Sequence, residues 1–227
     1  MPKRIPFSSD HIYHVYNRGV EKRKIFLENR DYVRFIHDLF ILNNENSVSN
    51  INYYFEGYAI EKNLIERKPR KLLVEILAFA LMPNHFHLIL RQKANNGIVR
   101  FMQKIGVAYS KFFNQKYDRV GSLFQGRFKS VILENESHFL YLPFYVHANP
   151  VSLINGKSSV RKMMGYLESY RWSSHLDYSG KHNFPSVISR EFILGTFGSE
   201  EIYKKQFKQF LSSKEKTSFL LGGYTLE

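Results

Sequence analysis

Residues 82–90 read Met-Pro-Asn-His-Phe-His-Leu-Ile-Leu, and they place two histidines at the start of an apolar stretch typical of a β-strand. Side chains at positions i and i+2 of a strand point to the same face of the sheet. His85 and His87 therefore project together, while Phe86 and Leu88 face the other way, into a core. Two imidazoles on one open face can bind a divalent metal and leave coordination positions for a substrate. Two ordinary polar residues on a half-exposed strand would show the same spacing, so the interpretation depends on the rest of the chain.

The hydrophobic pattern around this strand predicts an alternation of strands and helices. Strand-like stretches cover residues 11–18, 53–60, 75–82 and 127–133, and the pattern does not decide whether 53–60 or 75–82 joins the central sheet. Helical spacing covers residues 29–42, 96–116, 135–147, 163–170 and 200–211. Pro83 indicates a bend before His85, and Pro143 indicates a kink or break in its helix. This order predicts an α+β sandwich, with helices on one face of a mostly antiparallel sheet.

The composition excludes several classes of protein. The chain has 227 residues, of which 44% are hydrophobic and none is cysteine. A core can therefore form, whereas disulfide bonds and thiolate metal sites are excluded. No apolar stretch reaches the roughly 18 residues of a membrane span, and the first residues lack the apolar segment of a secretory signal. We expect a cytoplasmic protein without a membrane partner.

Positive charge is concentrated in one part of the chain. The net charge is +13, and residues 91–129 contain nine basic residues but only one acidic residue, Asp118. Aromatic residues are interleaved with these cations. Cations bind phosphates, and aromatic rings can stack on unpaired bases. Although a basic surface can also serve solubility, this clustering favours a nucleic-acid partner.

A second informative stretch, residues 145–150, reads Tyr-Val-His-Ala-Asn-Pro. Positions i and i+4 of a helix lie on the same face, so Tyr145 and Asn149 would present a phenol and an amide oxygen together. Because Asn149 precedes a proline, we expect it at the very end of the helix. A core aromatic would also explain Tyr145, and Tyr141 and Tyr109 are rival candidates for a functional tyrosine.

The two stretches together form a candidate metal site. His85, His87 and Asn149 would supply two imidazoles and one amide oxygen, with coordination positions left open. This mixed set of ligands suits Mg²⁺ or Mn²⁺, and zinc stays possible. A bound divalent ion could polarise a phosphate that is to be cleaved.

Five motifs in this order resemble the single-tyrosine HUH transposases, and particularly the REP-associated tyrosine transposases. The motifs occupy residues 13–19, 82–87, 121–129, 145–151 and 171–174. The resemblance implies a ferredoxin-like (RRM-like) catalytic domain that nicks and rejoins single-stranded DNA near hairpins. It also implies that His85 and His87 bind the metal, that Asn149 is a third polar ligand, and that Tyr145 is the nucleophile, forming a 5′-phosphotyrosine.

The sequence further suggests a division into two parts. Residues 1–155 would form the catalytic and DNA-binding domain, with a polar insert at about 43–72, and residues 156–227 a partly helical extension. The expected DNA contacts are Arg18, Arg91, Arg100, Lys104, Lys111, Phe124, Arg127 and Lys129. The partner would be single-stranded or hairpin DNA, and the protein a monomer or a homodimer.

Other functions share some of these features. A domesticated DNA-hairpin-binding protein without catalysis would also need the basic surface. A relaxase or replication initiator would use the same chemistry, although such proteins often carry a third histidine or a second tyrosine. A zinc hydrolase that acts through bound water fits less well, because no carboxylate accompanies the histidines.

Overall fold

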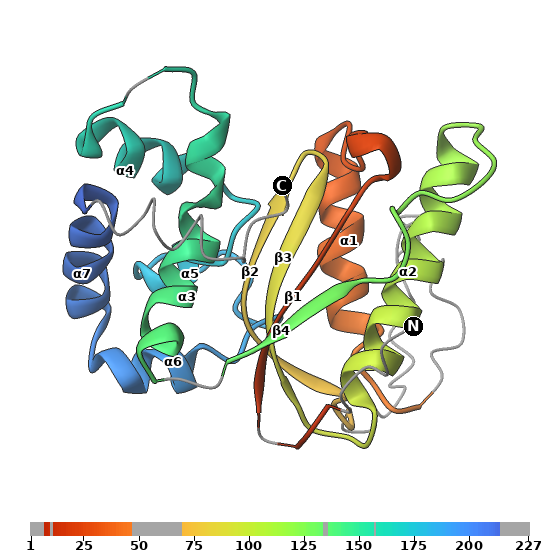
Figure 1. The fold of residues 1–227 in the computed structure, drawn as a ribbon, viewed down its shortest axis with the longest axis horizontal. Coiled ribbons are helices and arrows are strands. Elements are labelled where there is room, and N and C mark those ends of the chain that lie inside the picture. Colours follow the sequence, from red (N-terminus) through yellow and green to blue (C-terminus); the bar gives the residue numbers. More distant parts are fainter. Residues whose placement is uncertain (1–6, 10, 47–69, 134–135, 157, 214–227) are drawn as a thin grey trace, which may run out of the picture.

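The computed structural model describes residues 7–9, 11–46, 70–133, 136–156 and 158–213. Four antiparallel strands form a sheet at the centre of the molecule (Figure 1). The strands are β1 (Ile12–Arg18), β2 (Val74–Met82), β3 (His85–Gln92) and β4 (Lys129–Ile132), and their order in the sheet is β2-β3-β1-β4. The predicted strand at 53–60 lies outside the described residues.

The chain alternates between this sheet and helices. The short η1 (Val20–Lys22) and helix α1 (Asn29–Ile41) follow β1, and α2 (Gly97–Lys116) links β3 to β4. Pro83 and Asn84 turn the chain between β2 and β3, so the predicted bend before His85 is confirmed. The resulting order, βαββαβ, is that of the ferredoxin-like sandwich. The predicted α+β class with an antiparallel sheet is therefore confirmed.

Helices α1 and α2 cover one face of the sheet (Figure 1). Their apolar side chains form the core with the strand residues that point to this face. The ring of Phe35 on α1, for example, lies 5.0 Å from that of Phe86 on β3, measured between centroids. Glu28 and Asp31 form a reciprocal capping box at the start of α1, which satisfies backbone N–H groups of its first turn.

The opposite face of the sheet is also covered. Helix α3 (Glu136–Ala148) lies against it and is followed by η3 (Asn149–Leu153) (Figure 1). Behind them come α4 (Val160–Ser169), α5 (His175–Tyr178), α6 (Arg190–Phe197) and α7 (Glu200–Ser212). Helix α3 continues through Pro143 rather than ending there. The two-layer arrangement expected from the sequence is thus extended by a third, helical layer.

Sheet and extension share a single apolar core. Val15 of β1, Phe144 of α3 and Phe207 of α7 belong to the same cluster of buried side chains. This core includes residues on both sides of position 155. The domain boundary at residue 155 stays a prediction. No helix within the described ranges is both long and apolar enough to span a bilayer.

Candidate active site

Strand β3 places the two histidines where the sequence predicted. In the antiparallel register, His85 lies opposite Arg18 and His87 opposite Tyr16, and the two imidazole centroids are 5.0 Å apart. Phe86, between them, is 1% exposed and points to the other face. The expectation of an open face was wrong, however: His87 is also only 1% exposed, because α3 packs over it.

Hydrogen bonds at Nδ1 fix the orientation of both rings. Nδ1 of His85 donates to Oδ1 of Asn84 at 2.7 Å, and the Asn84 amide is itself held because Nδ2 donates to the Lys22 carbonyl at 3.2 Å. Nδ1 of His87 lies 2.8 Å from Nε2 of His14 on β1. When His87 donates in this pair, both histidines keep the lone pair of Nε2 for a ligand, as metal-binding histidines do.

Helix α3 brings Tyr145 to the same place. Its ring centroid lies 5.7 Å from that of His87 and 5.8 Å from that of His14, and the side chain is 3% exposed. The rival tyrosines lie elsewhere. Tyr109 donates its hydroxyl to the Ile25 carbonyl, in the core on the other side of the sheet, and Tyr141 is 36% exposed beside α7.

Asn149 connects these groups. It is the first residue of η3, directly after the end of α3, as its position before Pro150 predicted. Its Nδ2 donates to the Tyr145 carbonyl at 2.9 Å. Its side chain also reaches the imidazoles of His85 and His87 and the hydroxyl of Tyr145 as a hydrogen-bonding partner. One amide thus lies at the meeting point of all three side chains.

Burial controls the protonation of the site. It lowers the pKa of His85 to about 4, with a further contribution from the Arg18 charge, and it lowers the pKa of His87 well below the usual value. Both imidazoles are therefore neutral at pH 7, the form that binds metals. Burial raises the pKa of Tyr145 to about 12, although the Asn149 hydrogen bond acts against this increase. The phenol is accordingly protonated in the resting site.

The donor set fits a divalent metal if the amide takes part. Within the described ranges, no three side chains among His, Cys, Asp and Glu are grouped to hold a metal ion. A site here would instead consist of His85, His87 and the Asn149 oxygen, with His14 and Asn84 as the partners that orient the imidazoles. The mixture of nitrogen and oxygen donors, with positions left for substrate oxygens, is compatible with Mg²⁺ or Mn²⁺.

Sequence reasoning missed His14 and Asn84 as parts of this site. A signal for His14 was present, since residues 14, 16 and 18 alternate along β1 and must share one face. The cross-strand register that brings this face beside His87 could not be read from the sequence.

The predicted DNA contacts fall into two groups. Arg18 and Lys129 lie on the sheet face of the histidines, because they are opposite His85 and Tyr16 in the register. Arg18 also donates from Nε to Oε1 of Gln125 at 3.0 Å. Lys111 and Arg127 are exposed. These four cations stay predicted DNA contacts.

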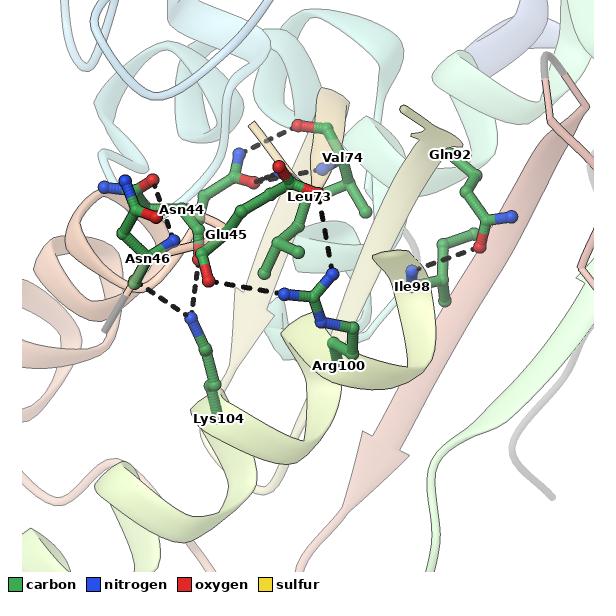
Figure 2. Close-up of polar contacts among 10 residues, drawn as sticks. Asn44, Glu45, Asn46, Leu73, Val74, Gln92, Ile98, Arg100 and Lys104 are labelled. Atoms are coloured by element: carbon green, nitrogen blue, oxygen red, sulfur yellow. Dashed lines mark hydrogen bonds and ion pairs between the residues drawn. The ribbon is translucent and has the colours of Figure 1, made fainter. Parts of the chain in front are cut away.

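Arg100 and Lys104 have a structural role. Figure 2 shows both side chains reaching from α2 to residues 44–46. Nη2 of Arg100 donates to the Glu45 carbonyl at 3.3 Å, and Nζ of Lys104 donates to the carbonyls of Asn44 at 2.5 Å and Asn46 at 3.4 Å. These bonds attach α2 to the segment that follows α1, which gives both side chains a role within the protein; a DNA contact by either stays a prediction.

Arg91 and Phe124 are also engaged within the protein. Arg91 pairs with Glu75, and its guanidinium lies 4.1 Å from the ring centroid of Phe192 on α6. Phe124 is 7% exposed and packs near Phe86. A ring that stacks on a base needs an exposed face. The stacking role predicted for Phe124 is therefore replaced by core packing.

One cavity lined by described residues lies away from the histidines. It has a volume of about 670 Å³ and opens between α2 and residues 121–128. Its wall includes Val99 and Met102 of α2 and Phe128 of the loop, and mostly apolar surface faces it. None of the residues around it is a histidine or Tyr145, so it is separate from the candidate active site.

Comparison with known proteins supports the assignment of the fold. A solved structure of a REP-associated tyrosine transposase bound to a REP hairpin matches with a TM-score of 0.50 and 14% sequence identity, over 83% of this chain and 90% of that one. A crystal structure of a putative transposase from Deinococcus radiodurans matches with a TM-score of 0.37 and 12% identity, over 63% of this chain and 93% of that one. No curated protein matches.

A family model identifies the group to which the chain belongs. The model of IS200-like transposases matches residues 36–149, half of the chain. The matched range begins in α1 and includes both histidines, Tyr145 and Asn149. This chain is therefore a member of the IS200-like transposase family.

Proposed function

We propose that this transposase is a metal-dependent enzyme that nicks and rejoins single-stranded DNA near hairpins through a covalent intermediate on Tyr145. The observation that carries the proposal is the meeting of His85, His87, Tyr145 and Asn149 in one place, contributed by β3 on one side and by α3 and the start of η3 on the other. A protein that only bound DNA would not need a buried tyrosine beside two neutral imidazoles.

Each residue has a defined task in this scheme. The neutral Nε2 atoms of His85 and His87 and the amide oxygen of Asn149 would hold Mg²⁺ or Mn²⁺. When bound, the ion would polarise the scissile phosphate and offset the negative charge that develops on its oxygens. Asn149 also bonds to the hydroxyl of Tyr145, and it would thereby keep the nucleophile next to the ligands.

The covalent step exchanges one phosphodiester bond for another. The phenolic oxygen of Tyr145 attacks the phosphorus and loses its proton to solvent, while the bond from phosphorus to O3′ breaks. The released O3′ takes up a proton and leaves as a free 3′-hydroxyl. The 5′-phosphate stays on Tyr145 as a phosphotyrosine diester. Attack by a 3′-hydroxyl reverses the step, so rejoining needs no nucleotide triphosphate.

The proposed substrate follows from the charge on the active-site face. Arg18 and Lys129 lie on the same face as the histidines and could bind backbone phosphates beside the scissile one. The solved structure that matches over 90% of its own length is that of a protein bound to a REP hairpin. We infer that a hairpin with a single-stranded flank is the substrate of this chain as well.

A nicking assay tests the proposal. The protein is incubated with Mn²⁺ and a labelled DNA hairpin that carries single-stranded flanks, and the products are separated under denaturing conditions. We expect a DNA–protein adduct and a fragment with a free 3′-hydroxyl. Tyr145→Phe should form no adduct, whereas Tyr141→Phe, one helical turn earlier and exposed, should retain it.

Three results would contradict the proposal. An adduct that persists in Tyr145→Phe would assign the nucleophile elsewhere. Hairpin binding that weakens steeply with salt, without cleavage under Mg²⁺, Mn²⁺ or Zn²⁺, would favour a DNA-binding protein without catalysis. Cleavage that leaves no covalent adduct would point to attack by water, as in a hydrolase.

A further inference from the structure

A buried hydrogen-bond cluster joins the last turn of α3 to the C-terminal helices. His147 on α3 is completely buried. Its Nδ1 lies 2.6 Å from the hydroxyl of Tyr203 on α7, and its Nε2 lies 2.7 Å from Oγ of Ser174, the residue that precedes α5. Both ring nitrogens of this histidine are therefore bonded to residues of the extension.

The partners of His147 are themselves held in place. Oγ of Ser174 accepts from the backbone N–H of Phe79 on β2 at 2.8 Å. The hydroxyl of Tyr203 also lies 3.3 Å from Nδ1 of His175 on α5. Each ring nitrogen of His147 faces a hydroxyl group, and a hydroxyl can both donate and accept, so the imidazole can bond as one donor and one acceptor. The cluster thus fixes the end of α3 to β2, α5 and α7 at once.

This attachment lies beside the proposed nucleophile and ligand. His147 is two residues after Tyr145 and two residues before Asn149. Neighbours two apart on a helix point to nearly opposite sides, which agrees with Tyr145 facing the sheet histidines while His147 faces the extension. Any rotation or shift of this turn would move both Tyr145 and Asn149 relative to His85 and His87.

The backbone at the end of this turn lacks one hydrogen-bond donor. Pro150, directly after Asn149, has no N–H that could bond to the carbonyl of Val146 one turn earlier. The side-chain bonds of His147 therefore add support at the end of α3.

We propose that His147 is a positioning residue, and that Tyr203 and Ser174 of the extension hold it so that Tyr145 and Asn149 keep their places beside the histidines. The extension then supports the active site through these two side chains. The inference rests on the proposed function, because the step affected is the attack by Tyr145. None of the three residues needs to contact DNA or metal in this role.

Two buried tyrosines provide a matched test. Tyr203 and Tyr178 are both fully buried, and Tyr178 donates its hydroxyl to the Leu77 carbonyl of β2, not to α3. Tyr203→Phe and Tyr178→Phe each remove one hydroxyl from the same region and preserve the ring. The assay measures single-turnover nicking of the hairpin with Mn²⁺, hairpin affinity, and thermal unfolding of each full-length variant.

We expect Tyr203→Phe to slow the nicking step by at least about tenfold, because small displacements of reacting groups carry large rate penalties. Its hairpin affinity should stay within about twofold of the wild type, a split between chemistry and binding that general destabilisation would not produce. Tyr178→Phe should keep the wild-type nicking rate even if its melting temperature falls as much as that of Tyr203→Phe. In NMR spectra of protein with ¹³C-labelled tyrosine, the signal of the Tyr145 ring should shift in Tyr203→Phe but not in Tyr178→Phe.

Equal nicking rates in the two variants, with active wild-type protein, would overturn the positioning role and leave the proposed function intact. Wild-type protein that does not nick at all would instead overturn the proposed function. If Tyr203→Phe fails to fold by circular dichroism, Ser174→Ala tests the other bond of His147. A wild-type nicking rate in folded Ser174→Ala would also contradict the inference.

Discussion

At the scale of single residues, the site depends on groups that orient the imidazoles. His14 and Asn84 contact the Nδ1 atoms of the two histidines on β3 and leave the opposite ring nitrogen for a ligand. Partners of this kind fix the tautomer and ring orientation of metal-binding histidines. His14 would therefore support the proposed metal site by orienting the His87 ring, without being a ligand itself.

Replacing His14 should weaken metal binding without removing a ligand. We expect His14→Ala to lower the affinity for Mn²⁺ by about 10- to 100-fold, the usual effect of removing an orienting partner. Isothermal titration calorimetry measures this affinity directly. His11→Ala, an exposed histidine in the same segment, is the control and should bind Mn²⁺ as the wild type does. Equal affinities for the two variants would contradict the role of His14.

The placement of these side chains could be predicted where the information was local. The two-residue spacing of His85 and His87 follows from the geometry of one strand, and the four-residue spacing of Tyr145 and Asn149 follows from a helix that ends just before Asn149. His14 was missed because its bond to His87 depends on the register between two strands, which are 73 positions apart at this contact. Burial of His87 was missed because it depends on α3 packing over the sheet.

At the scale of elements, basic side chains divide according to what surrounds them. Lys104 on α2 bonds to the backbone carbonyls of Asn44 and Asn46, whereas Lys129 on β4 is exposed on the active-site face. Charge alone could not separate these two lysines in the sequence. Their different surroundings lead to opposite expectations for alanine variants.

We expect Lys129→Ala to weaken hairpin binding and to reduce the salt dependence of binding by about one phosphate contact. Lys104→Ala should leave both quantities unchanged and lower the free energy of unfolding by about 1 kcal/mol, the usual value of a net hydrogen bond. Fluorescence anisotropy at several salt concentrations and urea unfolding measure the two effects. The opposite result would contradict these roles: Lys104→Ala would bind the hairpin more weakly, and Lys129→Ala would keep the wild-type salt dependence.

Elements with long periodic patterns were predicted well, and short ones were not. Helices α1, α2 and α7 have a clear apolar stripe of helical spacing, and the structure has them at the predicted ranges. The four residues of α5 are too few to show a period, and α6 was not recognised. These short helices form through tertiary contacts with the sheet and α7, which local sequence does not encode.

At the scale of the whole molecule, burial of neutral histidines makes stability depend on pH. Burial lowers the pKa of His14 and His175 to about 3, and it raises the pKa of Asp38 to about 6. Below pH 6.5 these histidines bind protons in the unfolded chain but stay unprotonated in the folded protein. The free energy of unfolding therefore falls as the pH drops. Asp38 acts in the opposite direction, because its folded form takes up a proton more readily than the unfolded chain.

Between pH 8 and pH 5, His14 and His175 should each lower the free energy of unfolding by about 2 kcal/mol, and Asp38 should return about 1 kcal/mol. His85, His87 and His147, whose pKa values burial also lowers, act in the same direction as His14 and His175, so the total loss should exceed about 3 kcal/mol. Urea unfolding at the two pH values measures this difference. His175→Phe should reduce the difference, and replacement of the exposed His11 by glutamine should not. Stability that is equal at both pH values would show that these histidines can be protonated in the folded state.

In the proposed reaction Tyr145 carries the DNA and is held next to His85 and His87 by the end of α3. Mass spectrometry of the covalent adduct, after digestion by protease and nuclease, identifies the residue that carries the DNA. We expect a nucleotide attached through its 5′-phosphate to the peptide that contains Tyr145. A nucleotide on a peptide with any other tyrosine, or attachment through a 3′-phosphate, would contradict it.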